Sequence, residues 1–325
     1  MFRTLITRPL VSRAACLAFT LAAGLASASA DAQNRNLTIG GGAVGGTWTV
    51  IGTAIGDYVS REVSDVRTTV IAGGGVKNIL GLSMDQLQLG FAYSSTAGEA
   101  LTGTGPFEKG KLPVMAVAGF YYAPWQLAVR ADSDIHTIKD LKGKGFSPGI
   151  KGFTGEVISR MVLGVNDMSY DDLARVEYID YNDSVNLIKD RHLDAFCPIA
   201  ADPTPSIQEL AASADGVRIV SLSDEEIKAI REINPGYATY PIPKDRYEGM
   251  TEDSQTIAAN TVLYVSPEVS PELVKKILEV MFDRVDDLRS LHPLMKNFSA
   301  ENAVKDLGAP LHPGAEAFYK ERGLL

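Results

Sequence analysis

The sequence predicts an α/β protein with two lobes, in which mostly parallel sheets are flanked by helices and a ligand cleft lies between the lobes. Strand-like apolar runs alternate with helical patterns along most of the chain, which is typical of such sheets. Three glycine-rich turns each open a helix, and two segments, 119–125 and 240–243, are interpreted as crossings between lobes. The 325 residues, 45% of them hydrophobic, suffice for two α/β domains.

The N-terminal segment 1–30 predicts a secretory signal peptide. It carries three arginines and no acid, an apolar stretch at 14–25, and the small-residue cleavage pattern Ala28-Ser29-Ala30. The stretch is too short and too rich in alanine for a membrane span. We therefore expect an exported protein, located in a bacterial periplasm.

The charge balance argues against several classes of partner. Formal net charge is −9, and it becomes −12 without the three arginines of segment 1–30. A chain this acidic is a poor candidate for binding nucleic acid or anionic lipid. Cys197 alone follows the signal segment, so no intrachain disulfide is expected, and its apolar neighbours favour a small buried side chain over a reactive thiol.

The first glycine turn has the sequence GGGAVGGTW at 40–48, after a strand-like run at 37–39 and before a helical pattern at 50–58. Glycines let the backbone approach a ligand closely, and the following helix directs unpaired N–H groups and a partial positive charge at the turn. Such a turn suits a carboxylate or a phosphate. Similar turns precede the helical runs 76–82 and 156–163, so we expect the three helix starts to converge on one cleft.

The other elements follow from apolar periodicity. Strands are expected at 37–40, 68–72, 87–92, 114–119, 126–130, 176–179, 195–197, 217–220 and 256–265. Further helices are expected at 203–212, 224–233 and 271–291. Ser223 and Glu226 predict a capping box at the start of the second of these helices. The crossings assign 37–122 and 242–325 to lobe I, and 123–241 to lobe II.

Three enzyme signatures fail on chemistry. Gly40, Gly42 and Gly45 fit the dinucleotide pattern G-x-G-x-x-G, but the second strand runs into glycines without the acid that holds a ribose. The segment GFSPG at 145–149 fits a nucleophile elbow, yet Pro148 has no N–H for an oxyanion hole. The four histidines lie far apart, without zinc-site spacing. We therefore expect no enzyme, no cofactor and no metal; an exported enzyme stays a minor alternative.

Four stretches resemble one family of proteins. They read GGGAVGGTW at 40–48, GGVKN at 74–78, DLKGK at 140–144 and PLHPGAEAFYKERG at 310–323. Together they resemble the TAXI family (TRAP-associated extracytoplasmic immunogenic proteins) over residues 37–325. The resemblance implies a type II-like periplasmic-binding-protein fold. It also implies a monomeric receptor that passes a small anionic solute to the membrane permease of a TRAP transporter. The receptor of an ABC importer, or a sensor partner, is the alternative.

The resemblance also implies a set of ligand-binding residues on four loops. These are Gly45, Gly46, Thr47 and Trp48; Gly74, Gly75 and Asn78; Tyr93, Ser94 and Ser95; and Phe153, Thr154 and Gly155.

The departures from the family pattern bear on the ligand. Ser95 stands where the family tends to have an acid, and an ammonium group needs an acidic or carbonyl partner. We therefore expect an organic acid without an ammonium group, partly apolar, such as a dicarboxylate or a keto-acid; a glutamate-like solute is the alternative. Lys77 and Lys151 flank two turns, either as ligand contacts or as solvated charges. Trp48 either faces the ligand or packs in the core.

Overall fold

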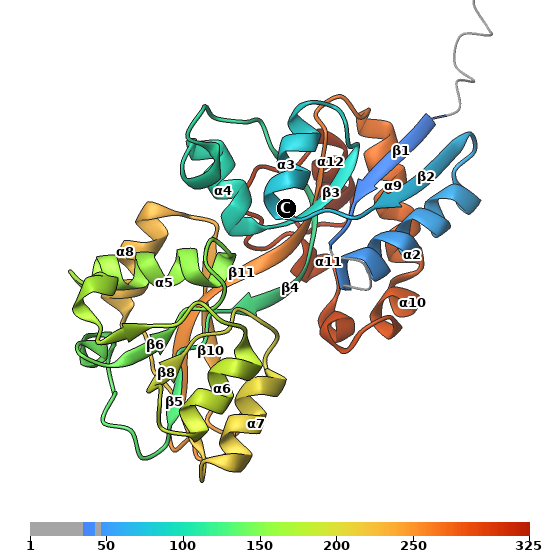
Figure 1. Ribbon diagram of the computed structural model, residues 1–325. Helices are drawn as coiled ribbons and strands as arrows, with labels where there is room; N and C mark the ends of the chain where they lie inside the picture. The colour runs from blue at the N-terminus through green and yellow to red at the C-terminus, as the bar shows by residue number, and fades with distance from the viewer. Residues whose placement is uncertain (1–34, 43–46) are drawn as a thin grey trace, which may run out of the picture.

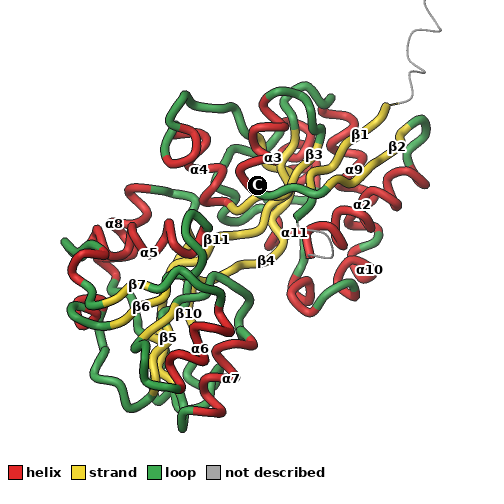
Figure 2. The backbone as a smooth tube through the Cα atoms, viewed as in Figure 1, coloured by secondary structure: helices red, strands yellow, loops and turns green. Residues whose placement is uncertain are grey.

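The computed structural model describes residues 35–42 and 47–325, and these form two lobes joined by long crossing strands (Figure 1). The predicted signal peptide and residues 43–46, including Gly45 and Gly46, lie outside the described residues. Each lobe is built around one sheet. The first sheet has the strand order β10-β11-β3-β1-β2, with β4 pairing to β11, and the second has the order β7-β6-β8-β5-β9 (Figure 2).

The first lobe begins with three parallel strands, β1 (Arg35–Gly40), β2 (Val66–Ile71) and β3 (Leu89–Tyr93). Ile39 pairs with Val70 of β2 on one side and with Leu89 of β3 on the other. Because these strands run in the same direction, their carboxyl ends lie along one edge of the sheet. The loops and helices that follow them begin at that edge.

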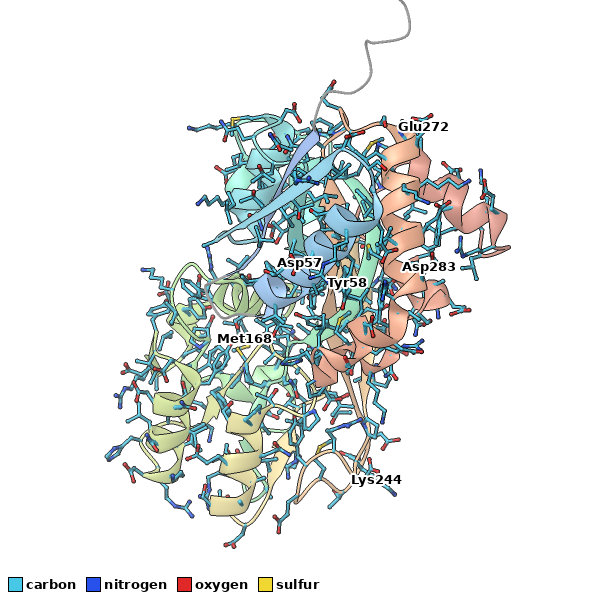
Figure 3. All side chains as sticks on the ribbon, turned by 90° about the vertical axis from the view of Figure 1, so that its right-hand side faces the viewer. Asp57, Tyr58, Met168, Lys244, Glu272 and Asp283 are labelled. Atoms are coloured by element: carbon cyan, nitrogen blue, oxygen red, sulfur yellow. The ribbon has the colours of Figure 1, made fainter. Side chains whose placement is uncertain are left out.

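Helices cover both faces of the first sheet. One face carries α2 (Thr47–Glu62), α9 (Pro271–Asp283), α10 (Val285–Ser290) and α12 (Pro313–Glu321), with the short η4 (Pro293–Asn297) and α11 (Ala300–Ala303) beside them. Figure 3 shows α2, on which Asp57 and Tyr58 are labelled, beside α9, on which Asp283 is labelled. The other face carries α3 (Gly75–Ser83) and α4 (Ser94–Thr102), with a separate apolar core beneath them.

The second lobe repeats this layout on shorter strands. They are β5 (Ala128–Arg130), β6 (Gly145–Ser147), β7 (Arg175–Val176), β8 (Ala195–Phe196) and β9 (Val217–Ile219). The helices are α5 (Thr154–Val165), α6 (Tyr181–Lys189), α7 (Pro205–Ser213) and α8 (Asp224–Ile233). α5 packs with α8, and α6 packs with α7, over two separate core clusters.

The crossing strands are β4 (Met115–Pro124), β10 (Tyr237–Ile242) and β11 (Ser254–Val265). β11 runs antiparallel to β3, β4 and β10, and β5 runs antiparallel to both of its neighbours. The α/β class with helix-flanked sheets is confirmed, but the pairing is mixed rather than mostly parallel. The reason is that the chain passes between the lobes and returns, so the returning strands oppose the outgoing ones.

The place of the return differs from the expected residue 242. Ile242 and Tyr247 pack in a core cluster of the second lobe, whereas Leu263 and Val265 pack in the first. These contacts favour a return along β11 itself. The division into 37–122 with 242–325 and 123–241 stays a prediction in its details.

Two of the expected helices can be compared with the structure, one by its start and the other by its length. The capping box is confirmed: the Ser223 hydroxyl accepts from the Glu226 N–H, and the Glu226 carboxylate accepts from the Ser223 N–H. The prediction of a single helix at 271–291 is wrong, because α9 ends at Asp283 and a second helix, α10, starts at Val285. Arg284 interrupts it with φ −112°, and its guanidinium pairs with Glu62 of α2.

Cys197 is buried, as its apolar neighbours indicate. Burial raises the pKa of its thiol to about 12, which outweighs the hydrogen bond with Ser159. The thiol is therefore protonated and inert at neutral pH.

A substitution at Gly308 tests the packing between the start of α4 and the segment that precedes α12. Its φ is +67°, and a Cβ added there would overlap the Ser94 carbonyl. Gly308→Ala is expected to lower the free energy of unfolding by roughly 2–5 kcal/mol, from left-handed strain plus overpacking. Gly323→Ala is the matched control, with φ +69° and open space, and should cost about 1–2 kcal/mol. Urea unfolding followed by circular dichroism measures both; equal losses would contradict the proposed overlap.

Candidate functional site

Helices in both lobes begin without a side-chain cap. α3 and α5 begin at Gly75 and Thr154, at the sheet edges where the parallel strands end, and neither has a side chain bonded to its first turn as a cap. α6 differs, because Asp180 accepts a hydrogen bond from the Asp183 N–H. The first N–H groups of α3 and α5 are thus left for an external acceptor.

The start of α4 is closed by the protein itself. Ser94 and Ser95 are buried at 0% and 1% exposure. The Ser94 hydroxyl donates to the Gly236 carbonyl (2.5 Å) and accepts from the Asn260 N–H (2.9 Å). The Ser95 carbonyl accepts from the Asn234 amide (3.0 Å). These serines join α4 to the crossing strands, so their geometry supports a scaffold role rather than the expected contact with a carboxylate.

Asn78 is likewise used inside the protein. It is 1% exposed, and its amide nitrogen lies 2.8–3.0 Å from the carbonyl oxygens of Gly40, Gly41 and Phe91. The side chain therefore joins the ends of β1 and β3, and holds the backbone that leads into the glycine loop. The resemblance implies that Asn78 contacts the ligand. Its hydrogen bonds in the structure instead support a role in shaping the loop.

Aromatic rings pack together in the first lobe around Trp48. Trp48 lies edge-on to Tyr93, with ring centroids 5.1 Å apart, and stacks with Phe91 at 6.3 Å. Trp48 is half-buried and packs against the first core, which supports the second of its two expected roles. Burial raises the pKa of Tyr121, and the neighbouring side chains of Trp48 and Thr47 partly offset this.

The two lobes approach each other at tyrosines. Burial raises the pKa of the Tyr93 hydroxyl well above its ordinary value, and the nearby Tyr121 and Tyr181 add to the shift. Tyr93 ends β3 of the first lobe and Tyr181 begins α6 of the second, where its hydroxyl accepts from the Ile199 N–H (3.2 Å). All three hydroxyls are protonated at neutral pH, so they offer O–H donors without charge.

A cavity of about 240 Å³, here called the cleft pocket, lies on the second-lobe side of this meeting point. Its wall includes Phe153 and Gly155 from the start of α5, Ile150 from the preceding turn, and Asp180 and Tyr181 from the start of α6. Phe153 is 64% exposed and Ile150 is 44% exposed. Exposed apolar side chains beside the uncapped start of α5 suit a ligand with an anionic end and an apolar body.

The turn before α5 is held by Glu156. The Glu156 carboxylate is buried, accepts from the Gly152 N–H (3.0 Å) and pairs with Arg160 (2.8 Å). Lys151 projects over the Tyr178 ring, with 5.3 Å from the Lys151 ammonium nitrogen to the ring centroid. Lys151 and Lys77 are both exposed.

Of the expected site residues, Phe153 and Gly155 line the cleft pocket. Trp48 and Tyr93 are in ring contact with each other in the first lobe, and the ligand-binding role of the whole set stays a prediction. Sequence reasoning missed Tyr181, Ile150 and the role of Tyr121. A signal existed for Tyr181, because Asp180 precedes it as a helix cap, but the approach of Tyr181 to Tyr93 joins positions far apart in the chain.

Comparisons with known proteins agree with this architecture. A TctC solute-binding protein from Polaromonas, without ligand, matches with a TM-score of 0.51 and 14% identity, covering 90% of this chain and 99% of its own. XAC2383 from Xanthomonas citri, bound to a chloride ion, matches with a TM-score of 0.53 and 14% identity, covering 88% of this chain and 95% of its own. At these identities the likeness shows the fold, which is that of periplasmic binding proteins.

The profile of the NMT1-like family matches residues 39–323. The chain belongs to the NMT1-like family, a family of periplasmic solute-binding proteins. Among the helices of the described residues, none is long and apolar enough to cross a bilayer. In the same part of the chain, histidine, cysteine, aspartate and glutamate side chains form no group of three or more that suits a metal ion.

Asn78 provides a test of the scaffold role. Asn78→Ala should lower the free energy of unfolding of the ligand-free protein by roughly 2–4 kcal/mol, because buried carbonyls lose their donor. The exposed Asn186→Ala on α6 is the control and should change it by about 0.5 kcal/mol or less. Chemical denaturation measures both. Unchanged stability together with lost solute binding would show that the amide is a ligand contact after all.

Proposed function

We propose that this protein is a periplasmic receptor that captures a small organic acid in the cleft and delivers it to a TRAP-type membrane permease. The observation that carries the proposal is the uncapped start of α5 beside the partly apolar cleft pocket. In the first lobe, α3 also begins without a side-chain cap. Backbone N–H groups at a helix start bind a carboxylate without a compensating side-chain charge. Membership of a solute-binding family supports the transport role.

The proposed contacts follow the loops of the resemblance. A carboxylate is held by the glycine loop with Gly45, Gly46 and Thr47, and by the first turns at Gly74 and Gly75 of α3 and at Thr154 and Gly155 of α5. Trp48, Tyr93 and Phe153 pack against the apolar part of the solute. Asp180 is the carboxylate in the wall of the cleft pocket, and it already caps α6. An ammonium group therefore lacks a free acidic partner there, which favours a dicarboxylate or a keto-acid.

A matched pair of ligands tests the solute class. 2-Oxoglutarate and L-glutamate share one skeleton and differ in a keto group against an ammonium group. Isothermal titration calorimetry is expected to show tighter binding of 2-oxoglutarate, by at least tenfold.

Thr154 locates that binding. Thr154→Pro keeps the start of α5, since proline is tolerated at the first helical position, but removes one N–H and the hydroxyl. It should weaken 2-oxoglutarate binding about tenfold, the equivalent of about 1.4 kcal/mol, while Thr154→Ser keeps the affinity. Tight glutamate binding that Thr154→Pro weakens would contradict the proposal of a solute without an ammonium group.

The permease class is tested by uptake. Proteoliposomes that contain the membrane subunits encoded beside this chain should accumulate the solute only when the receptor and an ion gradient are both present. Collapse of the gradient with an ionophore should abolish uptake, and removal of ATP should leave it unchanged. Dependence on ATP would instead favour the importer alternative. Conversion of the solute by the receptor alone would favour an exported enzyme.

A further inference from the structure

A second cavity, here called the hinge cavity, lies beside the crossing strands and measures about 490 Å³. Its wall includes Tyr122 and Asn260 from β4 and β11, Tyr240 from β10, Asp202 and Arg246 from loops of the second lobe, and Lys296 from η4 of the first. Its volume is within the range of small-molecule sites. None of its lining residues belongs to the first turns of α3, α5 or α6.

Asn260 lines this cavity and carries a buried acceptor without a donor among the described residues. The residue is 2% exposed, and its amide nitrogen donates to the Lys305 carbonyl (2.9 Å). This contact fixes the orientation of the amide, because a carbonyl accepts only from the nitrogen. Among residues 35–42 and 47–325, no group donates a hydrogen bond to its Oδ1. Buried acceptors of this kind are nearly always paired, so the atom is suited to a donor from a ligand.

Asp202 and Arg246 supply a second acceptor and a donor. The Asp202 side chain is 1% exposed, and its Oδ1 lies 3.1 Å from Arg246 Nε. The two atoms form an ion pair without a directed hydrogen bond, and neither has another hydrogen-bond partner in the described part of the chain. The Tyr240 hydroxyl lies 3.4 Å from the other oxygen, Oδ2.

Lys296 of η4 lines the same cavity from the first lobe. It is exposed and adds a second cation to the guanidinium of Arg246. The wall therefore combines two cations with a buried carboxylate and a buried amide oxygen. A ligand carboxylate suits the two cations, Arg246 and Lys296. A ligand group with several hydrogens to donate suits the two acceptors, Asp202 and Asn260.

We infer that the hinge cavity is a binding site for a small ammonium carboxylate, an amino acid, whose carboxylate pairs with Arg246 and Lys296 and whose ammonium group donates to Asp202 and Asn260. The hinge cavity shares no lining residue with the cleft pocket, where the proposed solute carries no ammonium group. Tyr121, which approaches Tyr93 at the meeting point of the lobes, also lines the hinge cavity. Because both lobes contribute to its wall, a ligand there contacts both lobes. The inference does not depend on which solute the cleft takes.

Three probes of equal size test the chemistry. L-Alanine, L-lactate and propionate are carboxylates with three carbons each. L-Alanine carries an ammonium group on its second carbon, L-lactate carries a hydroxyl group there, and propionate carries neither group. Calorimetry on the full mature chain is expected to show binding in the order L-alanine, L-lactate, propionate, with at least tenfold between the first and the last. Equal affinity for all three, or no binding of L-alanine, overturns the inference; preference for lactate replaces the ammonium carboxylate with a hydroxy acid.

Variants locate the binding. Asp202→Asn should weaken L-alanine at least tenfold, and Asp245→Asn, an exposed neighbour of Arg246, should leave it unchanged. Lys296→Gln should weaken it several-fold, while Lys244→Gln, at the far end of the second lobe (Figure 3), should not. Lys296 is exposed, so this pair stays informative if Asp202→Asn fails to fold.

Thr154→Pro separates the hinge cavity from the cleft. It should leave L-alanine binding intact, and Lys296→Gln should leave 2-oxoglutarate binding intact. L-Alanine binding that responds to Thr154→Pro but not to Lys296→Gln overturns the hinge site. Failure of 2-oxoglutarate binding alone concerns only the proposed function.

Discussion

The pairing of β4 with β11 is the constraint on which the rest of the structure depends. Its register runs from Met115 opposite Val265 to Pro124 opposite Ala258, and β11 is buried along nearly all of its length. One edge of β11 pairs with β3 in the first lobe and with β10 toward the second. The hydrogen bonds of a single strand therefore hold both lobes in one register, and the starts of the helices are placed relative to it.

The hinge cavity lies against this pair of strands, and the cleft pocket lies in the second lobe; the two candidate sites use different chemistry. The cleft relies on backbone N–H groups and neutral tyrosine hydroxyls, which attract a carboxylate locally although the whole chain carries a net charge of −9. The hinge cavity relies on charged side chains, with Asp202 and Arg246 brought together by burial. Burial raises the pKa of the Asp202 carboxyl, and the guanidinium opposes that shift. A site of the first kind needs no charged side chain, whereas a site of the second kind discriminates by charge pattern.

Local signals predicted the elements that depend on neighbours in the chain. The cap of α8 follows from Ser223 and Glu226, three residues apart, because both hydrogen bonds close within one turn. The long apolar run of β11 was equally readable. The end of α9 at Asp283 could not be predicted in this way. Arg284 interrupts the helix and pairs with Glu62, which lies more than two hundred positions earlier in the chain. β6, within the segment GFSPG, was also missed, because three residues are too few to show a period.

By itself the sequence determined the α/β class, the glycine-rich turns that open α3 and α5, and the broad class of solute-binding protein, because these depend on periodicity and on short motifs. Only the tertiary structure decided which side chains are free to meet a ligand. Asn78, Ser94 and Ser95 sit in motifs that resemble ligand loops, yet hydrogen bonds to Gly40, Gly236 and Asn234 engage them within the protein. Tyr181, Asp202 and Arg246 carry no motif, yet folding brings them to a cavity wall. A buried polar group takes the partner that lies closest in space, and distance along the chain does not report that partner.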